Sequence, residues 1–213
     1  MLKKRTIPEV KNLFDLSGKA AIVTGGSGGF GRAVARGLAA YGADVVVTSR
    51  TLSSLEETAG EVKETGRKVV PIPCDVTDPA SVEAMVAKTV RDLGKVDILV
   101  TGAGIAYRQP AEEMDIDQWQ KVMDVNVKGT LLCCQSVGRH MIKRGEGGKI
   151  ITVSSVRGIQ GHPAGYSAYG TSKGAVHLLT RQLSSEWAKY KINVNSIAPC
   201  IFWTPLTEPI LSN

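Results

Sequence analysis

The sequence predicts an α/β domain in which a doubly wound parallel sheet is covered by helices on both faces. Two observations support this class: short β-branched runs recur along the chain, and segments with helical spacing of apolar residues lie between them. The runs are too short for helices and too apolar for half-exposed strands, as is typical of buried parallel strands. Strands are predicted at residues 20–23, 45–47, 69–72, 96–100, 150–153 and 192–194.

Four segments between these strands are predicted to be helices, because apolar residues recur in them on one stripe. Their ranges are 30–41, 81–93, 116–143 and 167–190. Asp78 before Pro79 is typical of a cap followed by proline in the first turn, and Asp115 or Asp117 can cap the third helix. Strands that alternate with helices imply right-handed crossovers, and hence a parallel sheet.

The composition is that of a soluble globular protein. The 213 residues are 43% apolar and 22% charged, which is enough to bury a core without disulfides or metal ions. We expect a basic tail over residues 1–15 and a single domain over residues 16–213. The net charge is +6, of which +3 comes from the first eleven residues, namely Lys3, Lys4, Arg5 and Lys11 less Glu9. No basic cluster typical of nucleic-acid binding remains for the folded body.

The cysteines and the N-terminus indicate a cytoplasmic protein. The four cysteines lack the spacing of a metal site, so we interpret them as core thiols of a reducing compartment: Cys74, Cys133, Cys134 and Cys200. The N-terminus has no apolar stretch of signal-peptide length, and no run approaches about 18 apolar residues. We therefore expect neither a membrane partner nor a metal ion.

A glycine-rich loop from Thr24 to Gly31 follows the first predicted strand and opens the first predicted helix. Glycines there allow a tight turn and close approach to a pyrophosphate, which favours a dinucleotide site over a merely flexible loop. Ser49 and Arg50 stand at the end of the second strand, where an acidic residue would bind the ribose of NAD. Arg50 can pair with a 2′-phosphate, so NADP(H) is favoured over NAD(H) unless Arg50 only faces solvent.

Polar residues whose side chains can take part in a reaction occur later in the chain. Tyr169 and Lys173 are four residues apart and share one helix face. Ser154 and Ser155 end the fifth predicted strand, at the edge where ligands bind in open α/β sheets. Asn126 interrupts the apolar pattern of the long helix. Each feature alone has an ordinary structural alternative: a surface pair, a turn, or a tolerated polar residue.

Together and in this order, these motifs resemble the short-chain dehydrogenase/reductase family, from about Phe14 to Leu206. The motifs T-G-x-x-x-G-x-G and Y-x-x-x-K are complete, and Asp75-Val76, Asn126 to Gly129 and Asn193 to Asn195 match three others. The chain is most similar to gluconate 5-dehydrogenase-type and 3-oxoacyl reductase-type members. The resemblance implies a Rossmann-like sheet of order 3-2-1-4-5-6 and a homodimer or homotetramer.

The resemblance also implies roles for individual residues. Tyr169 would be the general acid in carbonyl reduction and the base in alcohol oxidation. Lys173, with the oxidised nicotinamide, would lower the Tyr169 pKa from about 10. Ser155 would hold the substrate oxygen, and Asn126 would fix a water that links Lys173 to solvent. The expected cofactor contacts are Gly25, Ser27, Gly29, Phe30, Gly31, Ser49, Arg50, Asp75, Val76, Ala103, Gly104, Tyr169, Lys173, Pro199 and Thr204.

The expected substrate is a small alcohol or ketone; a mixed aromatic and polar lining suits a sugar acid or a polyol but also admits a steroid or an acyl thioester. Arg157 and His162 lie between Ser155 and Tyr169, where they can meet a substrate carboxylate or simply face solvent. The residues expected at the mouth of the site are Tyr107, Arg108, Tyr166 and Trp203. The alternative function is a non-catalytic NADP-binding regulator on the same scaffold.

Three features depart from the family pattern. Thr101 and Gly102 replace the asparagines of N-N-A-G, which predicts a less constrained turn. Cys200 replaces the glycine of P-G-x-x-x-T, which predicts strain if that position has a positive φ. The sequence stops at Asn213, where a further helix and a seventh strand are expected. We favour an incomplete sequence over a truncated protein, because a stable protein of 213 residues would expose the edge of its sixth strand.

Overall fold

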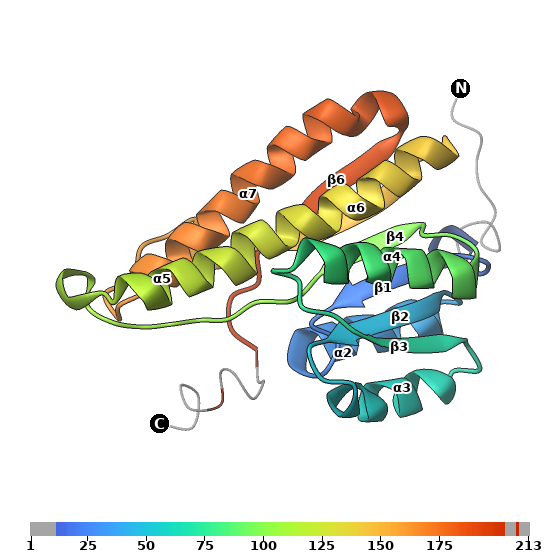
Figure 1. Cartoon of the computed structure of the whole chain (residues 1–213), viewed down its shortest axis with the longest axis horizontal. Coiled ribbons are helices and arrows are strands. Elements are labelled where there is room, and N and C mark those ends of the chain that lie inside the picture. Colours follow the sequence, from blue (N-terminus) through green and yellow to red (C-terminus); the bar gives the residue numbers. More distant parts are fainter. Residues whose placement is uncertain (1–11, 203–207, 209–213) are drawn as a thin grey trace.

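A six-stranded parallel sheet forms the centre of the computed structural model, which describes residues 12–202 and residue 208 (Figure 1). The strand order is β3-β2-β1-β4-β5-β6, so the predicted doubly wound sheet is confirmed. The strands are β1 (Ala20–Thr24), β2 (Asp44–Ser49), β3 (Val69–Pro73), β4 (Ile98–Thr101), β5 (Gly148–Val153) and β6 (Ile192–Ile197).

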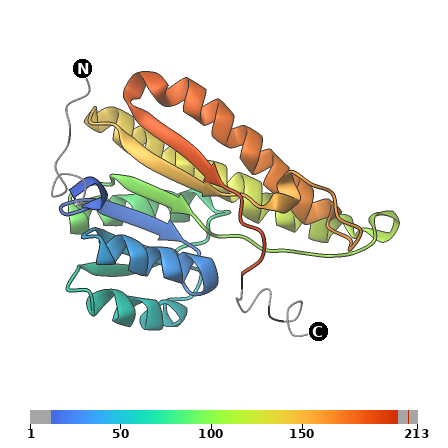
Figure 2. The same ribbon diagram turned by 180° about the vertical axis from the view of Figure 1, so that it is seen from behind.

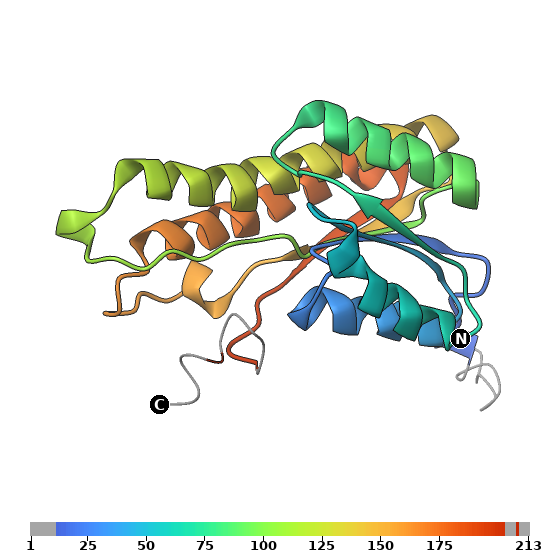
Figure 3. The same cartoon turned by 60° about the horizontal axis from the view of Figure 1, so that its bottom comes forward.

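Helices cover both faces of this sheet. The helices are α2 (Gly29–Ala40), α3 (Glu56–Lys63), α4 (Pro79–Leu93), α5 (Ile116–Met123), α6 (Gly129–Arg144) and α7 (Ser167–Trp187). Figure 2 shows α2 in front of the sheet, and Figure 3 shows α4, α6 and α7 on the opposite side. Successive strand residues point to opposite faces, so Val23 packs in the α2–α3 layer and Ile22 in the layer of α4 and α6.

Helix α3 lies in a segment for which no helix is predicted from the sequence. Its eight residues contain few apolar side chains, so their periodicity is weak. The helix is held by the fold: Ala59 and Val62 are buried against the sheet. On its other side, Arg32 of α2 forms ion pairs with Glu57 and Glu61. Tertiary contacts therefore override a weak local preference.

The predicted long helix is one continuous helical segment with a single π-helical interruption. α5 leads into the π-turn η4 (Asp124–Lys128), which leads into α6. Asp115, and not Asp117, caps α5, because its side chain accepts from the first-turn backbone. Asp78 caps α4 as predicted. π-turns inside α-helices are frequent at functional sites.

The segment around residue 15 contacts the end of α2. The ring of Phe14 lies 6.4 Å from that of Tyr41, and the Leu16 N–H donates to the Tyr41 carbonyl at 2.7 Å. A short 3-10 turn, η1 (Asn12–Phe14), includes Phe14, and the boundary after residue 15 stays a prediction. The remaining predicted tail, residues 1–11, lies outside the described residues.

The cysteines divide between core and surface. Cys74, Cys133 and Cys134 are buried, as predicted for core thiols. Cys200 is exposed, so that interpretation is wrong for this residue, which follows β6 where the chain leaves the sheet. Within the part of the chain that the structure describes, no helix has both the length and the apolar character needed to span a bilayer.

Candidate active site

Two adjoining cavities lie at the carboxyl ends of the strands. One, of about 490 Å³, contains Ser155, Tyr169 and Lys173 and is called the catalytic cavity after these candidate residues. The other, of about 660 Å³, contains Arg50 and Asp75, which are predicted to contact a dinucleotide, and is called the nucleotide cavity. Both cavities include Gly25, Ser27 and Gly104, so together they form one groove between β1 and β4, where the direction of winding reverses. Open α/β sheets bind ligands at this place.

The glycine loop packs backbone against backbone. Gly25 has a φ of +69°, and a Cβ at this residue would lie 2.7 Å from the Gly102 carbonyl oxygen. A Cβ at Gly31 would lie 2.2 Å from the Gly25 carbonyl oxygen. Gly28, which precedes α2, provides no side-chain cap, so first-turn N–H groups are left for a ligand. This glycine-walled cradle fits the pyrophosphate of a dinucleotide.

Thr58 of α3 supports the same loop from behind. Its buried hydroxyl donates to the Gly26 carbonyl at 2.8 Å, and the Gly26 N–H donates to the Thr48 carbonyl at 3.0 Å. Sequence analysis missed Thr58, because its role depends on a helix that the apolar pattern does not reveal. No local signal in the sequence marks it.

The residues predicted to contact the ribose and the adenine line the nucleotide cavity. They are Ser49, Arg50, Asp75 and Val76. The Ser49 hydroxyl donates locally to the Thr51 carbonyl at 2.9 Å. Hydrogen bonds from the backbone and hydroxyl of Thr77, together with the charges of Arg50 and Lys128, hold the Asp75 pKa below its usual value. Arg50 is exposed, so its guanidinium is accessible at this end of the groove.

The turn after β4 lacks the family's asparagines and is held by other contacts. The Ala103 N–H donates to the Thr24 hydroxyl at 3.2 Å, and a Cβ at Gly102 would lie 2.7 Å from the Thr24 carbonyl oxygen. The next residues are held by Asn126, which accepts from the Ile105 N–H and donates to its carbonyl, both at 2.9 Å. These contacts fix the backbone before and after Gly104, and the expectation of a less constrained turn at Thr101 and Gly102 stays a prediction.

Asn126 is fully buried in the π-turn and connects three segments. Besides Ile105, its amide donates to the Ser172 hydroxyl of α7 at 2.9 Å. Gly104 opens the space in front of it, because a Cβ there would lie 3.2 Å from Asn126 Oδ1 and 3.5 Å from Lys173 Nζ. Asn126 and Lys173 therefore approach the same point of the groove. Ser172 was not singled out from the sequence, because it lies inside the x-x-x of Y-x-x-x-K.

Tyr169 and Lys173 lie together in the catalytic cavity. Lys173 Nζ donates to the Val153 carbonyl at 2.7 Å and lies 5.7 Å from the centroid of the Tyr169 ring. Burial lowers the Lys173 pKa to about 8. Burial also raises the Tyr169 pKa above its usual value, and a hydrogen bond with Ser155 acts in the opposite direction. The expected lowering of the Tyr169 pKa involves the oxidised nicotinamide as well as Lys173, so it stays a prediction; among the protein groups, burial has the largest effect on this pKa.

The structure distinguishes the two serines after β5. Ser155 shares the cavity with Tyr169, and its hydroxyl accepts from the Arg157 N–H at 3.1 Å. The Ser154 hydroxyl points into α7, where it donates to the Lys173 carbonyl at 2.8 Å and lies 2.9 Å from Nδ1 of His177. Ser155 is thus the serine beside the phenol, and Ser154 ties β5 to the helix that carries Tyr169.

The other predicted residues fall in different places. Gly29, Phe30 and Pro199 line the catalytic cavity, and Ala103 lines the nucleotide cavity. Tyr107, which follows the turn after β4, also lines the nucleotide cavity, and its place at the substrate mouth stays a prediction. Four further residues line a separate neighbouring cavity: Arg108, Arg157, His162 and Tyr166. Trp203 and Thr204 lie outside the described residues.

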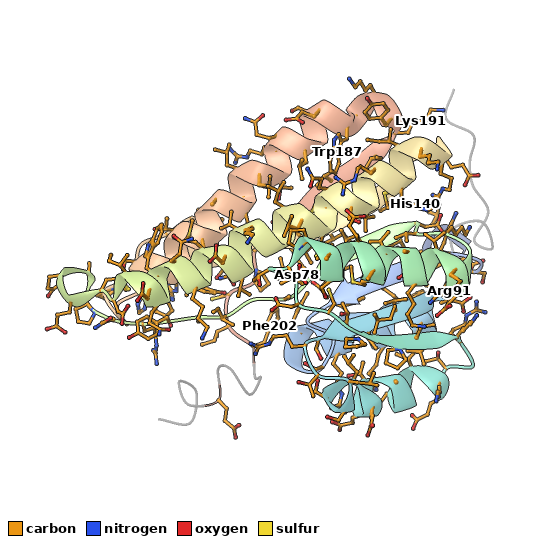
Figure 4. All side chains as sticks on the ribbon, in the orientation of Figure 1. Asp78, Arg91, His140, Trp187, Lys191 and Phe202 are labelled. Carbon is orange, nitrogen blue, oxygen red and sulfur yellow. The ribbon has the colours of Figure 1, made fainter. Side chains whose placement is uncertain are left out.

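The chain beyond β6 reaches the start of α2. Phe202, labelled in Figure 4, stacks on Phe30 with ring centroids 5.9 Å apart. Cys200 lies in this segment and also lines the catalytic cavity. Among the described residues, Lys191 is the one non-glycine residue with a positive φ, so the strain considered for Cys200 is absent.

Comparison with known proteins decides the family. A family model described as short chain dehydrogenase matches residues 19–213. The chain belongs to the short-chain dehydrogenase family. It is 40% identical to gluconate 5-dehydrogenase of Gluconobacter oxydans over 202 residues, covering 95% of this chain and 78% of that protein.

Solved structures of other short-chain dehydrogenases share this fold. One from Mycobacterium marinum superposes with a TM-score of 0.93 at 41% identity, covering 95% of this chain and 80% of that one. An NAD⁺-bound xylitol dehydrogenase gives 0.84 at 35% identity, covering 86% and 70%. This short-chain dehydrogenase is accordingly an oxidoreductase acting on CH–OH or C=O groups, of a family that uses nicotinamide dinucleotides.

Proposed function

We propose that this short-chain dehydrogenase interconverts a secondary alcohol and a ketone with NADP(H), and that its substrate is a sugar acid or a polyol. The observation that carries the proposal is the cavity in which Ser155, Tyr169 and Lys173 meet the glycine loop. No observation on the described residues favours the non-catalytic regulator.

Tyr169 moves the proton in the proposed reaction. When bound, the nicotinamide supplies the hydride for reduction or accepts it in oxidation. The raised pKa keeps Tyr169 protonated near neutral pH, so the phenol is ready to donate to a carbonyl oxygen. Ser155, hydrogen-bonded to the same phenol, holds and polarises that oxygen. Oxidation runs the proton step in reverse and is favoured by higher pH.

Lys173 and Asn126 support the tyrosine. The Lys173 ammonium has the Val153 carbonyl as one acceptor, and Gly104 leaves room in front of its Nζ for a cofactor hydroxyl. Asn126 faces the same space, where it orders the path by which a proton reaches Lys173. Lys173 and Asn126 are thus proposed to lie beside the bound cofactor.

Replacing Tyr169 with Phe tests the chemistry. The substitution removes one hydroxyl and keeps the ring, so NADPH binding should persist while turnover falls by at least about 100-fold. The measurement is NADPH absorbance with a panel of ketones, sugar acids and diketones, beside NADPH binding by fluorescence. Tyr190→Phe is the matched control, because Tyr190 is exposed in the 3-10 turn η6 (Ala188–Tyr190). Full residual activity of the Tyr169 variant would refute the assignment.

Arg50 carries the proposed preference for NADP. Its exposed guanidinium is suited to a 2′-phosphate, although Asp75 beside it also attracts the positive charge. Arg50→Ala should lower the NADP-to-NAD ratio of kcat/KM by roughly 10- to 100-fold, since a charge-assisted hydrogen bond is lost. An unchanged ratio would sink this part of the proposal.

The substrate class rests on relatives, whose names include gluconate 5-dehydrogenase and xylitol dehydrogenase. We also propose a cytoplasmic homodimer or homotetramer, as is usual for the family. Exposed apolar side chains on the long helices support association, among them Ile116, Leu131 and Leu178. Light scattering on the purified protein tests this, and a monomer at micromolar concentration would refute it.

A further inference from the structure

A third cavity, of about 970 Å³, lies beside the catalytic one and has no part in the proton and hydride chemistry. Its wall carries two arginines that share one aromatic ring. The guanidinium of Arg108 lies 5.8 Å from the centroid of Tyr166, and that of Arg157 lies 5.6 Å from the same centroid. His162 meets the ring edge at 5.3 Å. Positive charge is thus concentrated around one neutral side chain.

Neither guanidinium is neutralised by a neighbour. In the described part of the chain, neither Arg108 nor Arg157 forms an ion pair, and Glu112 lines the cavity without bonding to them. The ring attracts both cations but carries no net charge. Two guanidiniums that lie near one ring without an ion pair are suited to a planar anion, which can take two parallel hydrogen bonds from a guanidinium.

The two arginines are held in place by close backbone contacts. The Gln109 N–H donates to the Gly165 carbonyl at 3.1 Å, which joins the loop of Arg108 to the loop of Tyr166. Gly165 has a φ of +68°, and a Cβ there would lie 2.7 Å from the Gln109 carbonyl oxygen. Gly158, next to Arg157, packs so closely on α7 that a Cβ would lie 2.5 Å from the Lys173 carbonyl carbon. Such preorganisation lowers the entropy lost on binding.

The arginine pair is close to the catalytic phenol. The rings of Tyr166 and Tyr169 have centroids 6.1 Å apart, so an anion held at Tyr166 lies about one ring away from the reacting group. We infer that Arg108 and Arg157 bind the carboxylate of the substrate, and that this carboxylate is several carbons away from the carbon that is oxidised or reduced. The inference rests on the proposed function and narrows its substrate from polyol or sugar acid to the acid.

The test compares an acid with its uncharged counterpart. Wild type, Arg157→Gln and Arg108→Gln are assayed with gluconate and with sorbitol, which differ in the carboxylate. Each substitution should lower the gluconate-to-sorbitol ratio of kcat/KM by roughly 10- to 100-fold, mainly through KM, because charge-assisted hydrogen bonds are lost. Arg181→Gln is the matched control, since Arg181 is exposed farther along α7. Circular dichroism verifies that each variant is folded.

The outcomes separate this inference from the proposed function. If wild type oxidises neither compound, nor reduces any ketone of the panel, the proposed function fails. If wild type acts on both and the ratio does not change in either variant, the carboxylate assignment is overturned while the proposed function stands. Inhibition by unreactive hexanoate and by inorganic phosphate gives a second readout. Tighter competition by phosphate, lost in Arg157→Gln, would make the ligand a phosphate ester and would also overturn the assignment.

Discussion

The two ends of the groove are built on opposite principles. At the nucleotide end, close contacts exist because side chains are missing: Gly25, Gly31 and Gly102 let backbone touch backbone. At the catalytic end, side chains join distant segments, as the Asn126 amide does by bonding to the Ile105 backbone and the Ser172 hydroxyl. The glycine motif of the nucleotide end lies in one short stretch of sequence. The hydrogen bonds of the catalytic end form only when folding brings distant segments together.

The largest expected effect breaks the nucleotide end. Gly31→Ala would force a Cβ to within 2.2 Å of the Gly25 carbonyl oxygen, so the loop must move. We expect a loss of about 3 kcal/mol in the free energy of unfolding and NADPH binding weaker by at least about 10-fold. Gly28→Ala is the control, because a Cβ there meets nothing within 4 Å and its φ of 178° suits any residue. Thermal unfolding and NADPH titration measure both, and equal behaviour of the two variants would contradict the packing argument.

The next effect concerns the buried ammonium at the catalytic end. The Lys173 pKa is about 8 in the folded protein, against 10.5 for an ordinary lysine. Between these values the unfolded chain binds the extra proton, so the stability contribution of this group rises with pH by up to about 3 kcal/mol and is constant below pH 8. Lys173→Met should remove this rise from the stability–pH curve. Lys189→Met, at an exposed site, should keep it. A Lys173 variant whose curve runs parallel to wild type would refute the shift.

A smaller effect on stability is expected from replacing Asn126, which connects three segments at the catalytic end. Asn126→Ala leaves the Ile105 N–H and carbonyl without their buried partner and removes one of the two bonds of the Ser172 hydroxyl, which costs about 2 kcal/mol. Gln120→Ala removes an exposed bond to Asp124 on the same helical segment and should change stability far less. Urea denaturation distinguishes them. Equal losses would show that Asn126 does not join these segments energetically.

The smallest effect concerns the side-chain bond by which Thr58 supports the glycine loop. Thr58→Val keeps the shape of the side chain but removes the bond to the Gly26 carbonyl, for an expected loss of about 1 kcal/mol. Thr58→Ser retains the hydroxyl and should retain most of the stability. If both variants have the stability of wild type, the glycine loop does not need α3.

Sequence reasoning succeeded where the signal is local. The strands, the glycine loop and the cap at Asp78 follow from short patterns of turn, cap and apolar residues, whereas the strand order followed from the family resemblance. The pair Tyr169 and Lys173 was found for the same reason, since four residues make one helical turn.

The rest depends on contacts that no local pattern encodes. Helix α3 and Thr58 were missed because burial against the sheet stabilises a segment of weak periodicity. The burial that raises the Tyr169 pKa is a property of the assembled cavity. The place of Tyr107 likewise depends on the path of the chain after β4, which brings it to the wall of the nucleotide cavity.

The extra residue in the π-turn sets the direction in which the Asn126 side chain points. The Gly129 N–H donates to the Asp124 carbonyl, five residues back, so this turn holds one residue more than an α-helical turn. Deleting a single residue from Asp124–Lys128 would restore an ordinary helix and turn Asn126 away from Ile105 and Ser172. A regular α-helix over these residues and the Asn126 hydrogen bonds to Ile105 and Ser172 therefore exclude each other.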